Sequence, residues 1–217
     1  MDITWLGHSA VKIKGSKTVY IDPFLSENPA ASLSPEDITE ADVIIVTHDH
    51  ADHLGDAFSL CKKTGAVLVG IHEIAVAAGE EGIATEGMNI GGTVETGGVK
   101  VHMVNALHSC EMGNPAGVVL EMDGKTLYHA GDTALTYDMN LIGEFFKPDL
   151  SFLPIGDRYT MGIRSASKAV AFTRTKKVIP IHYDTFPLVN ADPDEFKKLV
   201  GDTAEVIILK PGESTSL

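Results

Sequence analysis

Six consecutive residues, 48–53, read His-Asp-His-Ala-Asp-His and follow almost directly on a strongly apolar stretch. The run 43–46, Val-Ile-Ile-Val, is typical of a strand covered on both faces. Leu54 and Gly55 then lead into a helical pattern. Three imidazoles and two carboxylates crowded at the carboxyl end of a buried strand are costly unless a cation is bound there. The fold must therefore end a buried strand at a place where a cation can bind.

The rest of the chain alternates between strand and helix patterns. Apolar or alternating runs predict strands at 11–14, 18–21, 43–46, 67–69, 99–104, 118–122, 150–153, 178–179 and 206–209. Helical periodicity appears at 55–63, 73–78, 141–146, 166–172 and 194–200. Strand-rich halves that are each closed by helices predict an α/β fold, a four-layer αββα sandwich. With 217 residues and no low-complexity linker, we expect one domain over 1–217.

The cluster at 48–53 has the residue types of a metal site. Neutral imidazole and ionised carboxylate suit Zn²⁺ or another first-row divalent ion. His48 and His50, two residues apart, can face one ion from a turn, whereas Asp52 and His53 point elsewhere and can serve a second ion. The alternatives are a solvated histidine-rich loop, or Asp52 as the N-terminal cap of the following helix.

Six residues cannot fill two coordination spheres, so further ligands must come from distant strand ends. Three candidates follow predicted buried strands: His108, Asp132 and His182. Each has a plain alternative when taken alone. A histidine at a strand end is often a structural residue, and Asp132 before Thr133 is a candidate helix cap.

In this order, the motifs resemble those of the metallo-β-lactamase superfamily over nearly the whole chain. The pattern is His-x-His-x-Asp-His, then a histidine, then Gly-Asp-Thr, then a strand-terminal histidine. Further segments are similar to one branch, the small metal-dependent hydrolases related to L-ascorbate-6-phosphate lactonases. These segments are Gly7-His8-Ser9, Ile-Asp-Pro-Phe at 21–24, Tyr-His-Ala-Gly-Asp-Thr at 128–133, Leu-Pro-Ile-Gly at 153–156, Thr160-Met161 and Pro-Ile-His-Tyr at 180–183.

The resemblance implies two divalent metal ions, zinc first, with manganese, nickel or iron as alternatives. Carried over position by position, it assigns seven ligands. The first ion would be held by His48, His50 and His108, and the second by Asp52, His53 and His182, with Asp132 bridging both.

Such a site predicts hydrolysis. Two ions that share a water lower its pKa toward about 7, and the bridging hydroxide would attack the substrate. Asp52 and Asp132 are the predicted catalytic carboxylates, with Asp52 accepting or shuttling the proton. An intact His53 favours hydrolysis over the redox chemistry of di-iron relatives, and the presence of Asp132 argues against β-lactam cleavage.

The expected substrate is a small ester, lactone or phosphodiester. One alternative is a nucleotide or small-molecule phosphodiesterase with the same site. An alternative from another class is a metal-loaded metabolite-binding or sensor module. The loop Gly156–Gly162 follows a strand, and the resemblance leaves its local shape open because Asp157 stands where the branch usually has glycine.

Four further residues are assigned supporting roles. His8 and His129 lie in motif segments and are expected to orient the metal ligands, with a purely structural role as the alternative. Arg158 and Tyr183 are candidates for substrate binding, and Arg158 has the geometry to hold a phosphate or carboxylate. A solvated, exposed Arg158 is the alternative.

Charge and composition limit the partners. With 17 Lys and Arg against 30 Asp and Glu, the formal net charge is −13, which argues against nucleic acid. A locally cationic metal site could still attract a small anionic substrate. Two cysteines fit a reducing cytosol, and neither a signal peptide nor an apolar run of membrane-spanning length is present, so we expect a cytoplasmic location and no membrane partner. Assembly into a homo-oligomer stays open.

Overall fold

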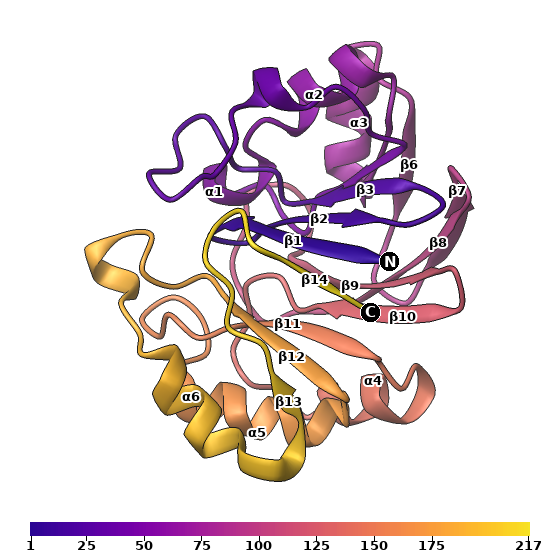
Figure 1. The fold of residues 1–217 in the computed structure, drawn as a ribbon. Coiled ribbons are helices and arrows are strands. Elements are labelled where there is room, and N and C mark those ends of the chain that lie inside the picture. Colours follow the sequence, from indigo (N-terminus) through magenta and orange to yellow (C-terminus); the bar gives the residue numbers. More distant parts are fainter.

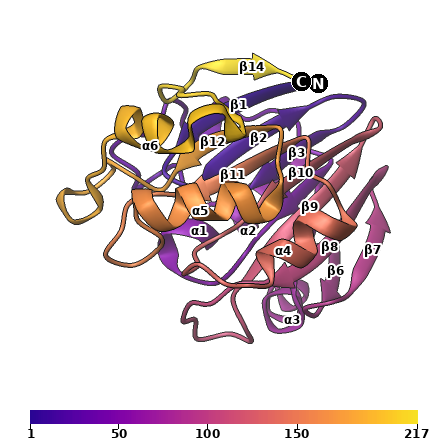
Figure 2. The same ribbon diagram turned by 90° about the horizontal axis from the view of Figure 1, so that it is seen from below.

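The computed structural model describes residues 1–217 and contains two seven-stranded sheets. The first sheet has the strand order β14-β1-β2-β3-β4-β5-β6. Its strands are β1 (Asp2–Gly7), β2 (Ala10–Lys14), β3 (Thr18–Ile21), β4 (Val43–Ile45), β5 (Val67–Ile71), β6 (Thr85–Met88) and β14 (Ser214–Ser216). The last strand pairs with the first, so both ends of the chain lie side by side at one edge of this sheet (Figures 1 and 2).

The second sheet is formed by the middle and the second half of the chain. Its strand order is β13-β12-β11-β10-β9-β8-β7. Its strands are β7 (Thr93–Thr96), β8 (Val99–Asn105), β9 (Ala116–Met122), β10 (Lys125–His129), β11 (Leu150–Pro154), β12 (Lys177–Ile181) and β13 (Glu205–Val206). The turn Asp123-Gly124 joins β9 and β10, and both residues have positive φ, as a tight hairpin requires.

Helices cover the outer faces of the two sheets (Figure 1). The first sheet carries α1 (Ala51–Leu54), α2 (Ala57–Thr64) and α3 (His72–Glu80). The second carries α4 (Met139–Phe145), α5 (Ile163–Thr173) and α6 (Pro193–Val200), which Figure 2 shows in front of its strands. Short 3₁₀ turns lie at Pro35–Asp37, Pro187–Val189 and Gly201–Thr203. The predicted four-layer αββα sandwich is confirmed.

One hydrophobic cluster of 55 buried residues fills the interior and draws on both sheets. Strand β4 illustrates why the apolar run at 43–46 was informative. It pairs in parallel with β3 on one side and β5 on the other, and Val43, Ile44 and Ile45 are fully buried. Covered on both faces and along both edges, it holds the following turn firmly in place.

Three details differ from the expectations. The helix predicted at 55–63 begins only at Ala57, because Gly55 has a φ of +41° and ends a separate short helix, α1; a Cβ at Gly55 would lie 2.6 Å from Phe24 Cα. The strand expected at 206–209 ends at Val206, because the chain then leaves the second sheet to form β14 in the first. Strand β8 ends at Asn105, so His108 lies in the loop that follows.

The strand directions place the functional loops at one edge of the sandwich. In the first sheet β1, β3 and β4 run in the same direction, since β2 is antiparallel to β1 and β3 while β3 and β4 are parallel. In the second sheet β8, β10 and β12 share a direction for the same reason. The loops after these six strands carry the predicted site, as is usual for the carboxyl ends of strands in α/β proteins.

Candidate metal centre

The structure brings together all seven residues that were predicted to bind metal. Three groups of side chains have ligand atoms that lie within 4.8 Å of one another. They are His48, His50 and His108; His48, His53 and Asp132; and His8, Asp52, His53 and His182. The first group is the trio predicted for one ion, and the last contains the trio predicted for the other, together with His8. The number and identity of the ions stay predictions.

Asp132 lies between the two predicted ligand trios. Its Oδ1 is 3.2 Å from Nε2 of His53, and its Oδ2 is 3.0 Å from Nε2 of His182. The same Oδ2 is 3.6 Å from Nε2 of His108. On the side of the first trio, Nε2 of His48 lies 3.0 Å from Nδ1 of His50. A carboxylate in this position faces ligands of both trios, as a bridging residue must.

Several buried polar atoms in this cluster have no hydrogen-bond partner. They are Nε2 of His53, Oδ1 of Asp132 and Nε2 of His182. Buried polar atoms are almost always paired, so a group of unpaired ones that face each other needs an explanation. A divalent cation supplies it, because neutral imidazole and carboxylate are the donors that zinc and related ions prefer. The residues present therefore fit the metal that the resemblance implies.

A buried carboxylate that the sequence analysis did not single out as a site residue orients two of these histidines. Asp22 follows β3, is fully buried and accepts hydrogen bonds from His53 Nδ1 at 2.7 Å and from the Thr47 hydroxyl at 2.7 Å and amide at 2.8 Å. Because the Thr47 hydroxyl donates to Asp22, its oxygen accepts from Nδ1 of His48 at 3.1 Å. Both rings are thus fixed with Nε2 free to bind a metal.

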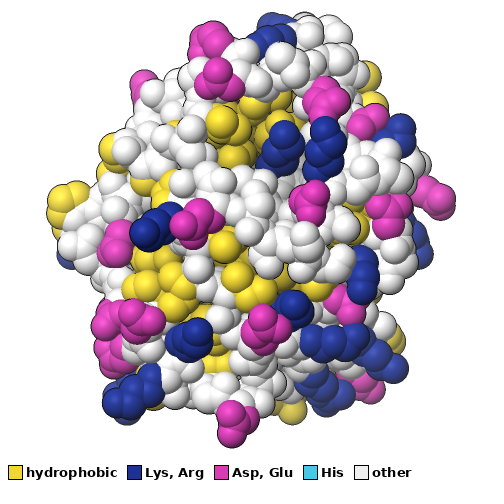
Figure 3. All heavy atoms as spheres, in the orientation of Figure 1, with side chains coloured by type: hydrophobic (Ala, Val, Ile, Leu, Met, Phe, Trp, Pro, Cys, Tyr) yellow, Lys and Arg dark blue, Asp and Glu magenta, His cyan; other side chains and the backbone are white.

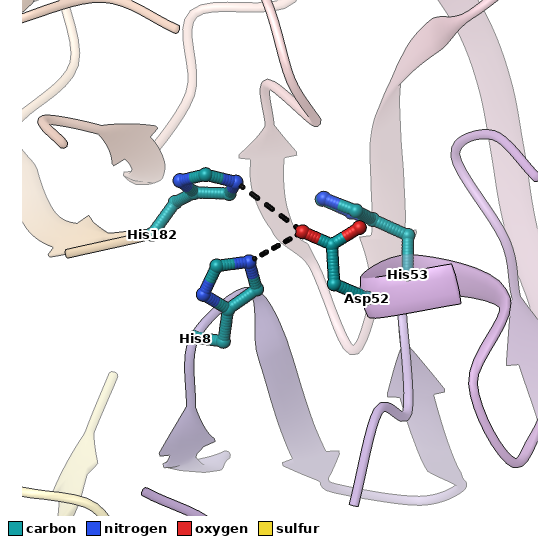
Figure 4. A group of neighbouring side chains, drawn as sticks. All are labelled: His8, Asp52, His53 and His182. Carbon is teal, nitrogen blue, oxygen red and sulfur yellow. Dashed lines mark hydrogen bonds and ion pairs between the residues drawn. The ribbon is translucent and has the colours of Figure 1, made fainter. Parts of the chain in front are cut away.

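His8 contacts the cluster directly, as Figure 4 shows. Its Nε2 is 3.0 Å from Oδ2 of Asp52, and its Nδ1 is 2.9 Å from the hydroxyl of Thr185. Because a carboxylate only accepts hydrogen bonds, Nε2 of His8 carries the proton and Nδ1 accepts from Thr185. The Asp52 carboxylate also lies 3.8 Å from His182 Nε2. His8 therefore holds the predicted ligand Asp52, and since both of its ring nitrogens are engaged, we assign it to positioning although it belongs to the last group.

His129 lies behind the cluster rather than in it. The amide of Gly131 donates to its Nδ1 at 3.1 Å, and its Nε2 donates to the carbonyl oxygen of Ser9 at 3.0 Å. These bonds tie the turn before Asp132 to the segment that carries His8. His129 thus bonds only to backbone groups beside the site, and its expected role in orienting the metal ligands stays a prediction.

The charges in the cluster depend on one another. Burial disfavours the ionised form of Asp132, but the neighbouring His53 and His182 outweigh burial and hold the pKa of Asp132 well below its ordinary value. The carboxylates Asp132 and Asp22 likewise overcome burial and raise the pKa of His53 well above its ordinary value. Burial lowers the pKa of His48 to about 3 and that of His8 to about 4. The cluster thus keeps its carboxylates ionised and these two imidazoles neutral, which are the forms that bind metal.

Three site residues have left-handed backbone conformations. The φ angles are +54° at His8, +47° at Asp22 and +55° at His182. Such values are uncommon for residues other than glycine and concentrate at functional sites. Each of these residues directly follows a strand, and the reversed backbone turns its side chain into the cluster.

The cluster opens into a cavity of about 450 Å³. Its lining consists of His8, His50, Asp52, His108, Ser109, Asp132, Tyr159, His182, Phe186, Leu188 and Val189. The side chain of Asp52 is 33% exposed, whereas that of Asp132 is 3% exposed. Asp52 is therefore the carboxylate that a bound small molecule can reach.

The two residues proposed to bind substrate do not line this cavity. Arg158 is exposed, and its guanidinium carbon lies 5.7 Å from the centroid of the Tyr159 ring. The Tyr183 side chain is buried against Trp5, with ring centroids 5.3 Å apart. The loop Gly156–Gly162 does reach the cavity, but through Tyr159. The left-handed φ of +59° at Asp157 explains why glycine suits that position.

The alternative capping roles are wrong. Asp52 is the second residue of α1, whose N-terminal cap is His50, so it does not cap that helix. After Asp132 no helix begins until Met139, which leaves nothing for Asp132 to cap.

No helix anywhere in the structure has the length and apolar character needed to cross a membrane.

Comparisons with known proteins agree with the fold and the motifs. A family model described as "Beta-lactamase superfamily domain" matches residues 17–183. A UPF0173 metal-dependent hydrolase of Archaeoglobus fulgidus is 49% identical over 227 residues, covering 99% of this chain and 98% of that protein. Another, of Thermococcus onnurineus, is 51% identical over 223 residues, covering 99% of each.

A solved structure is similar over the same extent. Igni18, described as a novel metallo hydrolase from the archaeon Ignicoccus hospitalis, is 38% identical with a TM-score of 0.93, covering 99% of this chain and 97% of that one. The sequence is thus similar to these relatives over nearly its whole length, and the backbone is similar to that of Igni18. The chain belongs to the metallo-β-lactamase superfamily and, within it, to the UPF0173 family of metal-dependent hydrolases.

Proposed function

We propose that the protein hydrolyses a small ester, lactone or phosphodiester with the help of two divalent metal ions, zinc foremost. The observation that carries this proposal is the set of buried, unpaired nitrogen and oxygen atoms that converge on one cavity. The names of the relatives, metal-dependent hydrolases, support the same reaction class.

Each proposed ion would have its own set of ligands. His48, His50 and His108 would hold one, Asp52, His53 and His182 the other, and Asp132 would contact both. When bound, divalent ions here would lower the pKa of a water molecule and polarise the carbonyl or phosphoryl oxygen of the substrate.

The protein's own groups supply proton transfer and positioning. Asp52 faces the cavity and is fixed by His8, so it is placed to accept the proton of an attacking water and pass it to the leaving group. Thr185 donates to His8 and keeps the proton of the ring on the side of Asp52. Asp132 is almost fully buried, and we assign it to holding the two ligand trios together.

Metal analysis of purified variants tests the site. Asp132→Ala and His50→Ala should each bind less metal than the wild type, because each removes a predicted ligand. His72→Ala, which changes an exposed histidine at the start of α3, should keep the wild-type content. Full metal content in both site variants would refute the assignment.

Activity assays separate the candidate functions. Metal-loaded protein would be offered aryl esters, lactones and aryl phosphodiesters, and the proposal expects turnover that is lost with a chelator and restored by metal. Turnover of phosphodiesters alone would make the protein a phosphodiesterase. Tight binding of a metabolite without turnover of any class would favour a sensor.

We also propose a cytoplasmic protein that acts on small molecules rather than on nucleic acid or membranes. The net charge of −13 and the two free cysteines support this proposal. Figure 3 shows acidic and basic side chains interspersed on one face, without the continuous basic surface that nucleic acid binding needs. A homo-oligomer stays a prediction, which light scattering of the purified protein would test.

A further inference from the structure

We propose that the cavity selects an uncharged substrate, a carboxylic ester or lactone with an apolar alkyl or aryl substituent, and that Phe186, Leu188 and Val189 form the wall that recognises it. This inference rests on the proposed function and narrows its substrate class. The volume of about 450 Å³ lies in the range of small-molecule sites.

The residues that line the cavity fall mainly into two groups, the predicted metal ligands with His8 and the apolar wall. Five lining residues are predicted metal ligands, and His8 holds one of them. Among the remaining five, Ser109 and Tyr159 offer only hydroxyl groups besides the tyrosine ring, and the other three are the apolar wall. No lysine or arginine lines the cavity. Beyond the metal-binding residues and His8, the lining offers no charged group to pair with a charged substituent.

The wall begins directly beside the reacting centre. The ring of Phe186 packs edge-on against the ring of His8 with centroids 5.7 Å apart, and His8 hydrogen-bonds Asp52. A substrate whose cleavable group lies next to Asp52 must therefore place its neighbouring substituent against Phe186. Carbon chains gain from this contact, whereas a carboxylate placed there would lose water without gaining a partner.

The rim of the cavity continues the apolar surface. Leu188 is 54% exposed and Tyr159 is 52% exposed, although both line the cavity. Large apolar groups left open to water at the mouth of a cavity are typical of a ligand-binding surface. A longer substituent would cover Leu188 and Tyr159, so we expect the site to favour chains that reach the rim.

The segment that carries the wall is tightly fixed. The amide of Asp184 donates to the carbonyl of Val189 at 3.0 Å, and the amide of Ala191 donates to the Asp184 carboxylate at 3.0 Å. The amide of Val189 in turn donates to the carbonyl of Phe186 at 3.0 Å. A wall held by its own backbone is preformed, so it can discriminate between substituents rather than adapt to them.

A chain-length series of 4-nitrophenyl esters tests the inference on zinc-loaded protein. Two methylene groups add up to about tenfold in kcat/KM when they are fully buried, so the values should rise from acetate to butanoate to hexanoate. The monoester of adipic acid matches hexanoate in length but ends in a carboxylate, and its kcat/KM should be at least tenfold lower. Equal values for hexanoate and adipate, or no dependence on length, would overturn the proposal.

Substitutions of Leu188, at the rim of the cavity, test whether the apolar wall causes the preference for long apolar substituents. Leu188→Ala should reduce the ratio of kcat/KM for hexanoate to that for acetate several-fold. Leu188→Lys should raise kcat/KM for adipate relative to that for hexanoate. Leu199→Ala changes a leucine of similar exposure on α6, outside the cavity, and should leave both ratios unchanged. Unchanged ratios in both Leu188 variants would exclude this side chain from recognition.

A binding measurement distinguishes failure of this inference from failure of the proposed function. Absence of metal-dependent turnover with every ester would count against hydrolysis. Calorimetric titration with acetohydroxamate, hexanohydroxamate and the monohydroxamate of adipic acid then tests the cavity without catalysis. The hexanoyl compound should bind at least tenfold more tightly than the other two, and equal or reversed affinities would refute the apolar wall.

Discussion

At the scale of single residues, Asp22 shows how a metal site depends on a side chain that never touches the metal. Its carboxylate accepts from His53 directly and reaches His48 through the Thr47 hydroxyl. Two imidazoles that belong to different predicted ions are therefore oriented by one buried group. Removing the charge of Asp22 should disturb the orientation of both imidazoles.

We predict that Asp22→Asn lowers zinc affinity about 10-fold to 100-fold, the usual effect of losing a carboxylate behind a metal-binding histidine. The amide can no longer accept all three hydrogen bonds with the charge that favours them. Competition with a chromogenic chelator measures the affinity. Asp202→Asn, at an exposed aspartate of the last 3₁₀ turn, is the matched control and should leave it unchanged. Equal affinities in wild type and Asp22→Asn would contradict this role.

Residue types and their positions after strands made these seven residues candidates, but the resemblance to the metallo-β-lactamase superfamily was needed to assign them as ligands, and the structure gathers all seven. Asp22 stood in one of the quoted motifs, but nothing in the chain shows that a lone aspartate after a strand is buried. Arg158 illustrates the opposite error. Its charge suggested anion binding, but its direction depends on a left-handed backbone at 157–158 that composition does not reveal.

At the scale of elements, the segment after β12 can approach the loop after β11 only because residue 156 is glycine. A Cβ there would collide with the carbonyl oxygen of His182 and would lie 3.0 Å from Cβ of Val189. The same glycine pairs with Gly162 to close its own loop. The close approach of these two loops, which border the cavity, thus depends on the absence of a side chain at residue 156.

Gly156→Ala should therefore lower the free energy of unfolding by about 1–3 kcal/mol, as overpacking usually does. It should also reduce activity, because the backbone at His182 must move. Gly79→Ala is the control, since the nearest atom to its Cβ would be 3.9 Å away and alanine favours the interior of α3. Urea unfolding of both variants measures the effect, and a neutral Gly156→Ala would show that the two loops have room to separate.

A second element-scale prediction concerns Asp149, which joins the starts of two strands. Its carboxylate accepts from the amide of Thr126 at 3.1 Å and from Lys176 at 2.6 Å. Burial disfavours the charge, but the Lys176 ammonium and the Thr126 amide outweigh it and hold the pKa of Asp149 below its ordinary value. The ionised form therefore stabilises the native protein.

Asp149→Asn should destabilise the protein by about 1 kcal/mol at pH 7. Because the pKa of Asp149 is lower in the folded protein, this contribution is present above the unfolded value near 4 and disappears as the pH falls through the folded value. The difference in stability between the two proteins should thus be smaller at pH 3 than at pH 7. Urea unfolding at both pH values measures the difference, and a gap that stays constant would exclude the charge as its cause.

Element positions were easier to predict than element ends. Buried runs such as 43–46 and helical periods such as 166–172 identified most strands and helices. The end of β13 at Val206 was missed because it depends on β14, which joins the other sheet. Such pairing between residues far apart in the chain leaves no mark in a local pattern.

At the scale of the whole molecule, the site joins the two sheets. Asp22 and His53 come from the loops of the first sheet, and Asp132 and His182 from those of the second. A cation held between them would link the two halves and would require them to be packed together. The stability of the molecule should depend on metal for this reason.

Zinc at a thousandfold excess over its dissociation constant should stabilise the folded state by about 4 kcal/mol, or roughly 10 °C in Tm for a chain of this size. Scanning calorimetry of chelator-treated and zinc-loaded protein measures the shift. The Tm of Asp132→Ala should rise much less on addition of zinc, because this variant lacks the carboxylate between the two ligand trios. Identical Tm values with and without zinc would show that the two halves gain nothing from the metal.

The reversed backbone at His8, Asp22 and His182 has an evolutionary consequence. At each position glycine would fit the backbone more cheaply, so the chain gives up some stability to keep a functional side chain there. Selection for thermal robustness alone would therefore erode the site, starting at the turns that follow β1, β3 and β12. Imidazole and carboxylate at these three turns are therefore what natural selection for activity, rather than for folding, would favour.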